Sequence, residues 1–212
     1  MLPSATTDHK TLLREALTKA LPGEMAHRVL LPHGRGLYPA AGVNNIKQSS
    51  VLVLIFPENG QLHTCLIRRP TTMRHHGGQI AFPGGRSELS DKSLVQTALR
   101  ESFEEIGIGE SQIEIVGALT PLYVEVSNFM INPFVGWCES LPPFKPDNRE
   151  VDELLIIPVD KFLSQTTEWR SVVTPRGNLN VPGFFIDPPF IWGATAMIIS
   201  EFKEIYLSLK KR

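Results

Sequence analysis

The strongest chemical signal in this chain is a short charged stretch that follows the glycine pair Gly84-Gly85. A helix-like run in this stretch carries one arginine and three glutamates: Arg100, Glu101, Glu104 and Glu105. Residues three and four apart share one face of a helix, so we expect the three carboxylates to converge on one spot. Clustered carboxylates repel one another unless a cation lies between them, and such oxygen ligands suit Mg²⁺ or Mn²⁺, which keep waters and reach substrate phosphates. The spacing therefore predicts a divalent-metal site.

A basic stretch precedes the acidic one. From Asn59 to Ser87 the chain contains no Asp or Glu. It contains arginines and histidines instead: Arg68, Arg69, Arg74, Arg86, His63, His75 and His76. Two interpretations are open. The stretch forms a cradle for a polyanionic phosphate substrate, with His75 and His76 facing the phosphates, or it is a solvated loop that balances the acids nearby.

Composition is typical of a soluble enzyme. A chain of 212 residues with 42% hydrophobic content can bury one full core. The formal net charge of −1 gives no attraction to nucleic acid or membrane, and neither is expected as a partner. The first 23 residues lack the apolar core of a signal peptide, so we expect a cytoplasmic protein. Cys65 and Cys138 are too few for a disulfide framework and are interpreted as reduced packing residues.

Apolar periodicity predicts the elements that position these residues. An amphipathic helix is expected near residues 12–21 and is ended by Pro22-Gly23, and a second one is expected to close the chain, from Trp192 to Leu209. The acidic run forms a third helix, with Val95, Ala98, Leu99, Ser102 and Ile106 turned towards a core. Strands are expected at 51–56, 62–67, 79–82, 113–119, 130–137 and 154–157. Asn59-Gly60 marks a hairpin turn, residues 142–150 form an exposed connection, and Pro158 starts a brief helix.

The acidic segment resembles a known motif, the Nudix box. That pattern has a Gly, an acid six residues on, then R-E-x-x-E-E-x-G and an apolar residue. The matching residues are Gly85, Asp91, Arg100, Glu101, Glu104, Glu105, Gly107 and Ile108. Gly85 and Arg100 are one residue further apart than in the general box, Asp91 replaces the usual Glu, and Ser102 stands where an aliphatic residue is common.

With these departures, the segment resembles the motif of one branch of the Nudix hydrolases, the coenzyme A pyrophosphatases. That branch has an upstream LLxxR element, a short basic loop and then GQ(I/V)xFPGG. The similar segments here are residues 65–69, 73–79 and 80–85. Residues 127–135 and 191–196 also resemble the branch, so the likeness covers most of residues 50–200. Residues 1–47 carry no usable motif.

The resemblance implies a fold, a reaction and a set of site residues. The fold class is α/β, a Nudix-type α/β/α sandwich around a mixed β-sheet in residues 48–212, with residues 1–47 as an N-terminal helical extension packed outside. The reaction is hydrolysis of the pyrophosphate linkage of coenzyme A to 4′-phosphopantetheine and adenosine 3′,5′-bisphosphate. The implied metal ligands for Mg²⁺ or Mn²⁺ are Glu101, Glu104, Glu105 and a backbone carbonyl near Gly84 or Gly85. The implied substrate-binding residues are Arg68, Arg69, Arg74, His75, Gln79, Gly84 and Gly85, and Arg100 is expected to orient the carboxylates.

Several alternatives stay open. The general base is either a carboxylate of the box or Glu153, in the acidic cluster after the proline-rich connection. The substrate is coenzyme A, or another nucleoside diphosphate compound such as a dinucleotide or a nucleotide sugar. A third hypothesis is a Nudix-fold binding module without catalysis. Such modules usually lose acids of the box, so the presence of all three glutamates argues against it. The sequence does not indicate an oligomeric state.

Overall fold

A mixed β-sheet forms the centre of the molecule, which is described by a computed structural model over residues 5–73, 76–174, 177–186 and 189–210. Its strands are β1 (Lys47–Glu58), β2 (Gln61–Arg68), β3 (Ile80–Ala81), β4 (Gly84–Arg86), β5 (Glu114–Ala118), β6 (Leu122–Val124), β7 (Phe129–Trp137) and β8 (Glu153–Pro158). The helices are α1 (Ala5–Leu17), α2 (Glu24–Arg28), α3 (Leu94–Ile106), α4 (Val159–Leu163) and α5 (Gly193–Lys210), and residues Glu110–Gln112 form a 3₁₀ turn.

The β1–β2 hairpin confirms the clearest strand prediction. Asn59 and Gly60 both have positive φ angles, of 49° and 76°, as the tight turn between the strands requires. The main sheet then runs in the order β3-β2-β1-β7-β5, with β4 paired to β1, β6 to β7 and β8 to β2. Only the β1–β7 pair is parallel among these pairs of the described strands, so the sheet is mixed, as expected.

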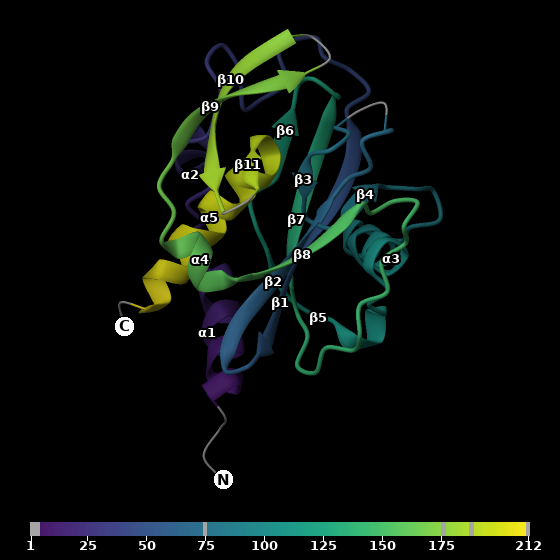
Figure 1. Cartoon of the computed structure of the whole chain (residues 1–212), viewed down its shortest axis with the longest axis vertical. Helices are drawn as coiled ribbons and strands as arrows, with labels where there is room; N and C mark the ends of the chain where they lie inside the picture. The colour runs from purple at the N-terminus through teal and green to yellow at the C-terminus, as the bar shows by residue number, and fades with distance from the viewer. Residues whose placement is uncertain (1–4, 74–75, 175–176, 187–188, 211–212) are drawn as a thin grey trace.

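Alternation along β1 divides the core into two layers. Leu52, Leu54 and Phe56 face α3 on one side, whereas Val53 and Ile55 face the layer that contains α1 and α5. Figure 1 shows α3 on one side of the sheet and α5 on the other. The expected α/β/α arrangement is therefore confirmed.

The N-terminal segment belongs to the larger of the two core layers. Leu13 of α1 is almost fully buried, and α1 packs against β5 and α5. The expectation of a helix packed outside the main domain has to be refined, because the apolar face of α1 lies in the same hydrophobic core as α5. Cys65 and Cys138 are buried and free, as expected.

A second sheet lies beside α5 and was not indicated by the sequence. Its strands are β9 (Glu168–Thr174), β10 (Gly177–Phe185) and β11 (Phe190–Trp192), in the order β11-β10-β9. Trp192, predicted as the start of the last helix, is instead the last residue of β11, and α5 begins at Gly193. In the described part of the chain, no helix combines the length and the apolar content needed to cross a membrane.

A buried carboxylate on α5 ties three distant segments together. Glu201 is fully buried and accepts hydrogen bonds from the backbone N–H groups of Gly23 and Thr120 and from the Thr120 hydroxyl, at 2.6 to 3.2 Å. His27 Nε2 lies 3.0 Å from Glu201 Oε2. Because a buried carboxylate needs several donors to offset its lost hydration, these contacts fix the start of α2 and the β5–β6 connection against α5.

We predict that Glu201→Gln lowers the free energy of unfolding by about 2 to 4 kcal/mol, because an amide N–H would face donors that now bind a carboxylate oxygen. Urea denaturation followed by circular dichroism measures this change. Glu204→Gln is the control on the exposed side of the same helix and should stay within about 0.5 kcal/mol of wild type. Equal stabilities for the two variants would contradict the anchoring role.

Candidate active site

The acidic residues lie on a well-terminated helix, α3. The Ser93 hydroxyl accepts a hydrogen bond from the Gln96 N–H and caps its first turn. Gly107 ends the helix in the left-handed conformation, with φ of 75°, and its N–H bonds to the Phe103 carbonyl. The helix is therefore held at both ends, which fixes the direction in which its carboxylates point.

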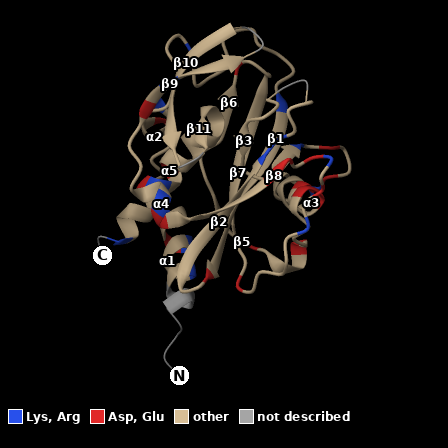
Figure 2. Cartoon of the chain, viewed as in Figure 1, with Lys and Arg blue, Asp and Glu red and all other residues tan. Residues whose placement is uncertain are grey.

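The three glutamates of α3 occupy different environments. Glu105 is 2% exposed, next to the core residues of the helix, because it lies on the same face as Ala98 and Ser102. The Glu101 side chain is 14% exposed, and that of Glu104 is 45% exposed. Figure 2 shows acidic and basic residues gathered around α3, on the opposite side of the molecule from α5.

The glycine pair at β4 packs directly against the acids. The Gly84 N–H donates a hydrogen bond of 2.8 Å to Glu105 Oε2. A Cβ atom at Gly85 would overlap the Glu101 carboxylate, and Gly84 has a φ of 151° with β1 backbone where its side chain would lie. Gly84 therefore requires glycine, and a side chain at Gly85 would displace the Glu101 carboxylate.

Arg100 is the centre of the charged network. Its guanidinium binds both oxygens of Asp91, at 2.9 and 3.0 Å, and donates to the Arg86 carbonyl. Nη1 lies 2.9 Å from Glu101 Oε1 and 3.0 Å from Glu104 Oε2. The fixed fork of an arginine sets carboxylate directions in this way, so Arg100 positions Glu101 and Glu104.

Asp91 holds Arg100 in place. Its carboxylate also accepts hydrogen bonds from the Glu88 N–H and the Thr97 hydroxyl, each 2.9 Å long. Hydrogen bonds from Arg100 hold the pKa of Asp91 well below its usual range, and those with Asp91 raise the pKa of Arg100. The sequence analysis named Asp91 as the acid of the box, with Asp in place of the usual Glu, but nothing in the spacing reveals that it contacts Arg100.

Burial perturbs the two inner carboxyl groups. It raises the pKa of Glu105 to about 8, although the Gly84 N–H and the Arg69 guanidinium act in the opposite direction. Burial also raises the pKa of Glu101, against the nearby Arg100. In both groups the hydrogen bonds and nearby positive charge do not fully offset the hydration lost on burial, so the neutral form is favoured. A cation bound between them would stabilise the ionised carboxylates.

The expected convergence of three carboxylates on one spot is not what the structure shows. Glu104 points to the exposed side of Arg100, whereas Glu105 points to Gly84. Among the described residues, no group of three or more His, Cys, Asp or Glu side chains is arranged to hold one ion. Glu101 and Glu105 provide carboxylate oxygens close to the β4 backbone, and this donor set suits a hard divalent cation that keeps several waters.

Ser50 adds an unpaired polar group to the same region. Its hydroxyl is fully buried and has no hydrogen-bond partner within the part of the chain that the structure describes. Ser50 pairs with Gly85 across β1 and β4. The alternation of β1 turns it to the α3 side, with Leu52 and Leu54. An unpaired buried hydroxyl on the side of the sheet that faces α3 agrees with a site built to receive a polar or charged group.

The two adjacent arginines of the basic stretch have different partners. Arg69 Nη1 lies 3.6 Å from Glu105 Oε1, so Arg69 belongs to the acidic site. Arg68 instead forms an ion pair of 2.8 Å with Glu153, which lies opposite it across the β2–β8 pair. The structure therefore brings Arg69 to the box acids and joins Arg68 with Glu153.

The loop between β2 and β3 is described only in part. Arg74 and His75, both predicted to bind substrate, lie outside the described residues. Gln79 Oε1 lies 3.0 Å from His76 Nδ1, and the Gln79 carbonyl accepts a hydrogen bond from the Arg69 N–H. Gln79 is thus joined to the backbone of Arg69, next to the acidic site.

Glu150, which the sequence analysis did not select, lies on the connection that the fold brings back to the end of α3. Its charge contributes to the raised pKa of both Glu101 and Glu105. The connection that carries it follows the end of α3, where the Asp147 N–H bonds to the Glu105 carbonyl at 3.1 Å and the Glu150 N–H bonds to the Asp147 carbonyl at 2.9 Å. No motif marks a residue that a proline-rich connection brings back to a helix, so only the fold reveals it.

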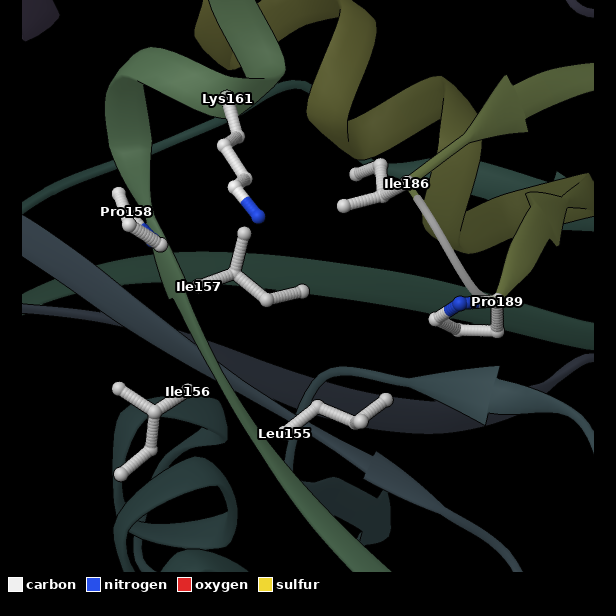
Figure 3. A pocket seen from close by; sticks show the side chains of 7 residues that line it. All are labelled: Leu155, Ile156, Ile157, Pro158, Lys161, Ile186 and Pro189. Carbon is white, nitrogen blue, oxygen red and sulfur yellow. The ribbon is translucent and has the colours of Figure 1, made fainter.

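A separate hollow of about 110 Å³ lies between β8, α4 and the end of β10. Figure 3 shows its lining of aliphatic side chains and prolines, with the Lys161 amine near Ile157. None of the residues that line it comes from α3 or β4. This hollow is therefore distinct from the acidic site.

This chain is similar to known proteins of one family. A family model described as the NUDIX domain matches residues 46–176. An uncharacterized Nudix hydrolase, NudL, of Pectobacterium atrosepticum is 35% identical over 162 residues, which is 75% of this chain and 82% of that protein. NudL of Yersinia pestis is 38% identical over 141 residues, covering 66% of this chain and 70% of that protein.

A solved structure shows the same fold. The crystal structure of a Nudix hydrolase from M. smegmatis, RenU, superposes with a TM-score of 0.50 at 16% identity. The match covers 77% of this chain and 87% of that one.

We predict that Asp91→Asn lowers the free energy of unfolding at pH 7 by about 2 kcal/mol, because an amide is a weaker acceptor for Arg100 than a carboxylate. A depressed pKa means that the ionised carboxylate stabilises the fold above its unfolded pKa, and that this stabilisation is lost as the pH falls through the folded pKa. The difference from wild type should therefore shrink below about pH 4. Denaturant titrations at pH 7 and pH 3 measure it, with the exposed Asp160→Asn as a control; a difference that is independent of pH would contradict this role.

Proposed function

This chain belongs to the NUDIX domain family, and from that premise we propose that it hydrolyses the pyrophosphate linkage of coenzyme A. It is a Nudix hydrolase, an enzyme class that acts on nucleoside diphosphate compounds and generally uses divalent metal ions. Two features support coenzyme A as the member of that substrate class. They are the residue pattern of segment 65–85 and the position of that segment in the fold.

The contact between Arg69 and Glu105 is the observation that carries this proposal. Arg69 ends the upstream element that resembles the coenzyme A branch, and its guanidinium lies 3.6 Å from a buried carboxylate of the box. The same segment ends in Gly84 and Gly85, which pack on Glu105 and Glu101. A basic group beside the acids is placed to bind the diphosphate of a substrate whose phosphates also contact a cation.

Glu101 and Glu105 would hold the cation, with a carbonyl near Gly84 or Gly85, and Glu104 would support them through Arg100. A bound Mg²⁺ or Mn²⁺ supplies charge neutralisation at the diphosphate and lowers the pKa of water. The chain itself supplies orientation. Arg100 fixes the direction of Glu101, and the Gly84 N–H fixes that of Glu105.

The proton of the attacking water requires a carboxylate acceptor. Glu153 is engaged by Arg68, whereas the charge of Glu150 acts on both Glu101 and Glu105. The candidates for the group that accepts this proton are the carboxylates within the box, Glu101 and Glu105, and the carboxylates outside it, Glu153 and Glu150.

The proposed reaction consumes one water. Its oxygen attacks one phosphorus of the diphosphate, the bond from that phosphorus to the bridging oxygen breaks, and the bridging oxygen leaves on the other phosphate. The proton goes to the carboxylate base. Coenzyme A and water thus give 4′-phosphopantetheine and adenosine 3′,5′-bisphosphate. The extra 3′-phosphate of the substrate leaves a further anionic group for the basic stretch to bind.

A second candidate substrate is another nucleoside diphosphate compound, such as a dinucleotide or a nucleotide sugar. The box residues serve either substrate equally, because they act on the diphosphate alone. A binding module without catalysis is a third candidate, and the buried Glu105 argues against it. A carboxylate with a raised pKa is costly to retain in a core where a neutral residue would pack.

We predict that the purified protein with Mg²⁺ or Mn²⁺ converts coenzyme A to adenosine 3′,5′-bisphosphate, and that a metal chelator abolishes this conversion because the diphosphate charge is then unscreened. Chromatography of reactions with coenzyme A, a dinucleotide and a nucleotide sugar measures it. Glu105→Gln, purified in parallel, excludes a contaminating hydrolase. Cleavage restricted to another compound would reject coenzyme A and keep the chemistry, and cleavage of none would support the binding module.

A further inference from the structure

Ser50 is a buried polar residue to which the proposed reaction gives no role. It lies on β1, its side chain is fully buried, and its hydroxyl has no hydrogen-bond partner among the described residues. Bulk solvent does not reach a hydroxyl at this depth, so it does not replace the missing partner. A buried polar group without a partner is costly and uncommon in folded proteins. The position of Ser50 relative to the acidic site gives a reason for this cost.

The strand register places Ser50 on the same face of the sheet as the Glu101 carboxylate. Ser50 lies directly opposite Gly85 in the antiparallel pair of β1 and β4. Residues opposed in this way direct their side chains to one face, with Cβ positions about 5 Å apart. The Cβ atom that a side chain at Gly85 would add lies 2.2 Å from Glu101 Oε2. Because α3 packs against both strands (Figure 1), the Ser50 hydroxyl and the Glu101 carboxylate are neighbours in one layer.

The polar neighbour of Ser50 on its other side is engaged elsewhere. Asn132 lies beside Ser50 in the parallel pair of β1 and β7. Its amide N–H groups donate to the Ser49 carbonyl at 2.9 Å and to Gln48 Oε1 at 3.1 Å. The fold therefore directs the nearby amide to other acceptors and leaves the Ser50 hydroxyl open on the side that faces α3.

Thr64 provides an internal comparison. Its hydroxyl is also buried and has no hydrogen-bond partner among the described residues. Thr64 lies opposite Ile55 in the β1–β2 hairpin, and Ile55 belongs to the core layer that contains α1 and α5. The two hydroxyls thus occupy opposite faces of the sheet, and of these two only that of Ser50 faces the carboxylates of α3.

We propose that Ser50 is a positioning residue of the metal site, whose hydroxyl accepts a hydrogen bond from a water molecule on the cation held by Glu101 and Glu105. Divalent cations of this kind keep several of their waters. A water bound through its oxygen presents only its O–H groups to the surroundings, so it requires an acceptor. The Ser50 hydroxyl is an unused acceptor on this face of the sheet.

This inference rests on the metal-dependent reaction proposed above and deepens it. Groups outside the inner ligands hold those ligands and the bound waters in place, and they contribute to metal affinity. The role of Ser50 concerns the cation alone. It therefore applies equally to coenzyme A and to another nucleoside diphosphate substrate.

We predict that Ser50→Ala weakens Mn²⁺ binding by about tenfold or more, as the loss of such an outer partner usually does. Isothermal titration of Mn²⁺ into the metal-free chain measures the change. Thr64→Val is the matched control, because it removes the other unpaired buried hydroxyl and keeps the shape of the side chain. Its Mn²⁺ affinity should equal that of the wild-type chain.

Urea unfolding of the same variants separates this role from a structural one. Removing a buried hydroxyl that has no partner should leave the unfolding midpoint of the metal-free chain unchanged or raise it. Both variants should therefore be at least as stable as wild type without metal. A fixed Mn²⁺ concentration should then raise the midpoint less for Ser50→Ala than for Thr64→Val, because weaker binding gives less stabilisation.

The outcomes distinguish this proposal from the choice of substrate. Mn²⁺ binding by Ser50→Ala as tight as by wild type would overturn it, and so would equal weakening in Thr64→Val. A metal-free Ser50→Ala chain less stable than wild type would also overturn it, by showing a structural role. A wild-type chain that binds no Mn²⁺ would overturn it together with the metal site. Weakened Mn²⁺ binding in Ser50→Ala without cleavage of coenzyme A by wild type would reject the substrate and support the role of Ser50.

Discussion

Burial of the Glu105 carboxylate is the constraint on which the arrangement of the site depends. A carboxylate removed from water has to be compensated by donors or by a cation. Among the described residues, Glu105 has the Gly84 N–H and, at 3.6 Å, the Arg69 guanidinium as partners. These partners do not fully offset the hydration that the carboxylate loses on burial, and the pKa of Glu105 is therefore raised. The glycine pair at β4 makes this close packing possible. A side chain at Gly84 would meet the β1 backbone and one at Gly85 would meet the Glu101 carboxylate, so the strand could not lie as close to Glu101 and Glu105.

Arg100 gives the three glutamates different roles, because it contacts two of them and not the third. It is fixed by Asp91 and in turn fixes Glu101 and Glu104, whereas Glu105 depends on the β4 backbone. The inner carboxylates are thereby available to a cation, and Glu104 remains on the surface as part of the arginine network. On the other side of the sheet, Glu201 joins the N-terminal segment to α5, so the two layers are each organised around a buried carboxylate.

The sequence predicted most of the central sheet and of the acidic helix, because both carry strong local patterns. The β1–β2 hairpin followed from an apolar run and Asn59-Gly60, and α3 followed from its periodicity. The second sheet was missed, since β9 alternates weakly and is half exposed. Contacts between residues distant in sequence could not be predicted either. Spacing does not reveal that Arg68 pairs with Glu153, or that the connection after β7 brings Glu150 back to α3.

The central claim is that the inner pair Glu101 and Glu105, and not the more exposed Glu104, holds the divalent cation. Isothermal titration of Mn²⁺ into the wild-type chain, Glu105→Gln and Glu104→Gln tests it most directly. We expect Glu105→Gln to weaken binding by more than about a hundredfold and Glu104→Gln by less than about tenfold, since only the first removes an inner carboxylate. Equal losses in the two variants, or Mn²⁺ binding to Glu105→Gln as tight as to wild type, would contradict it.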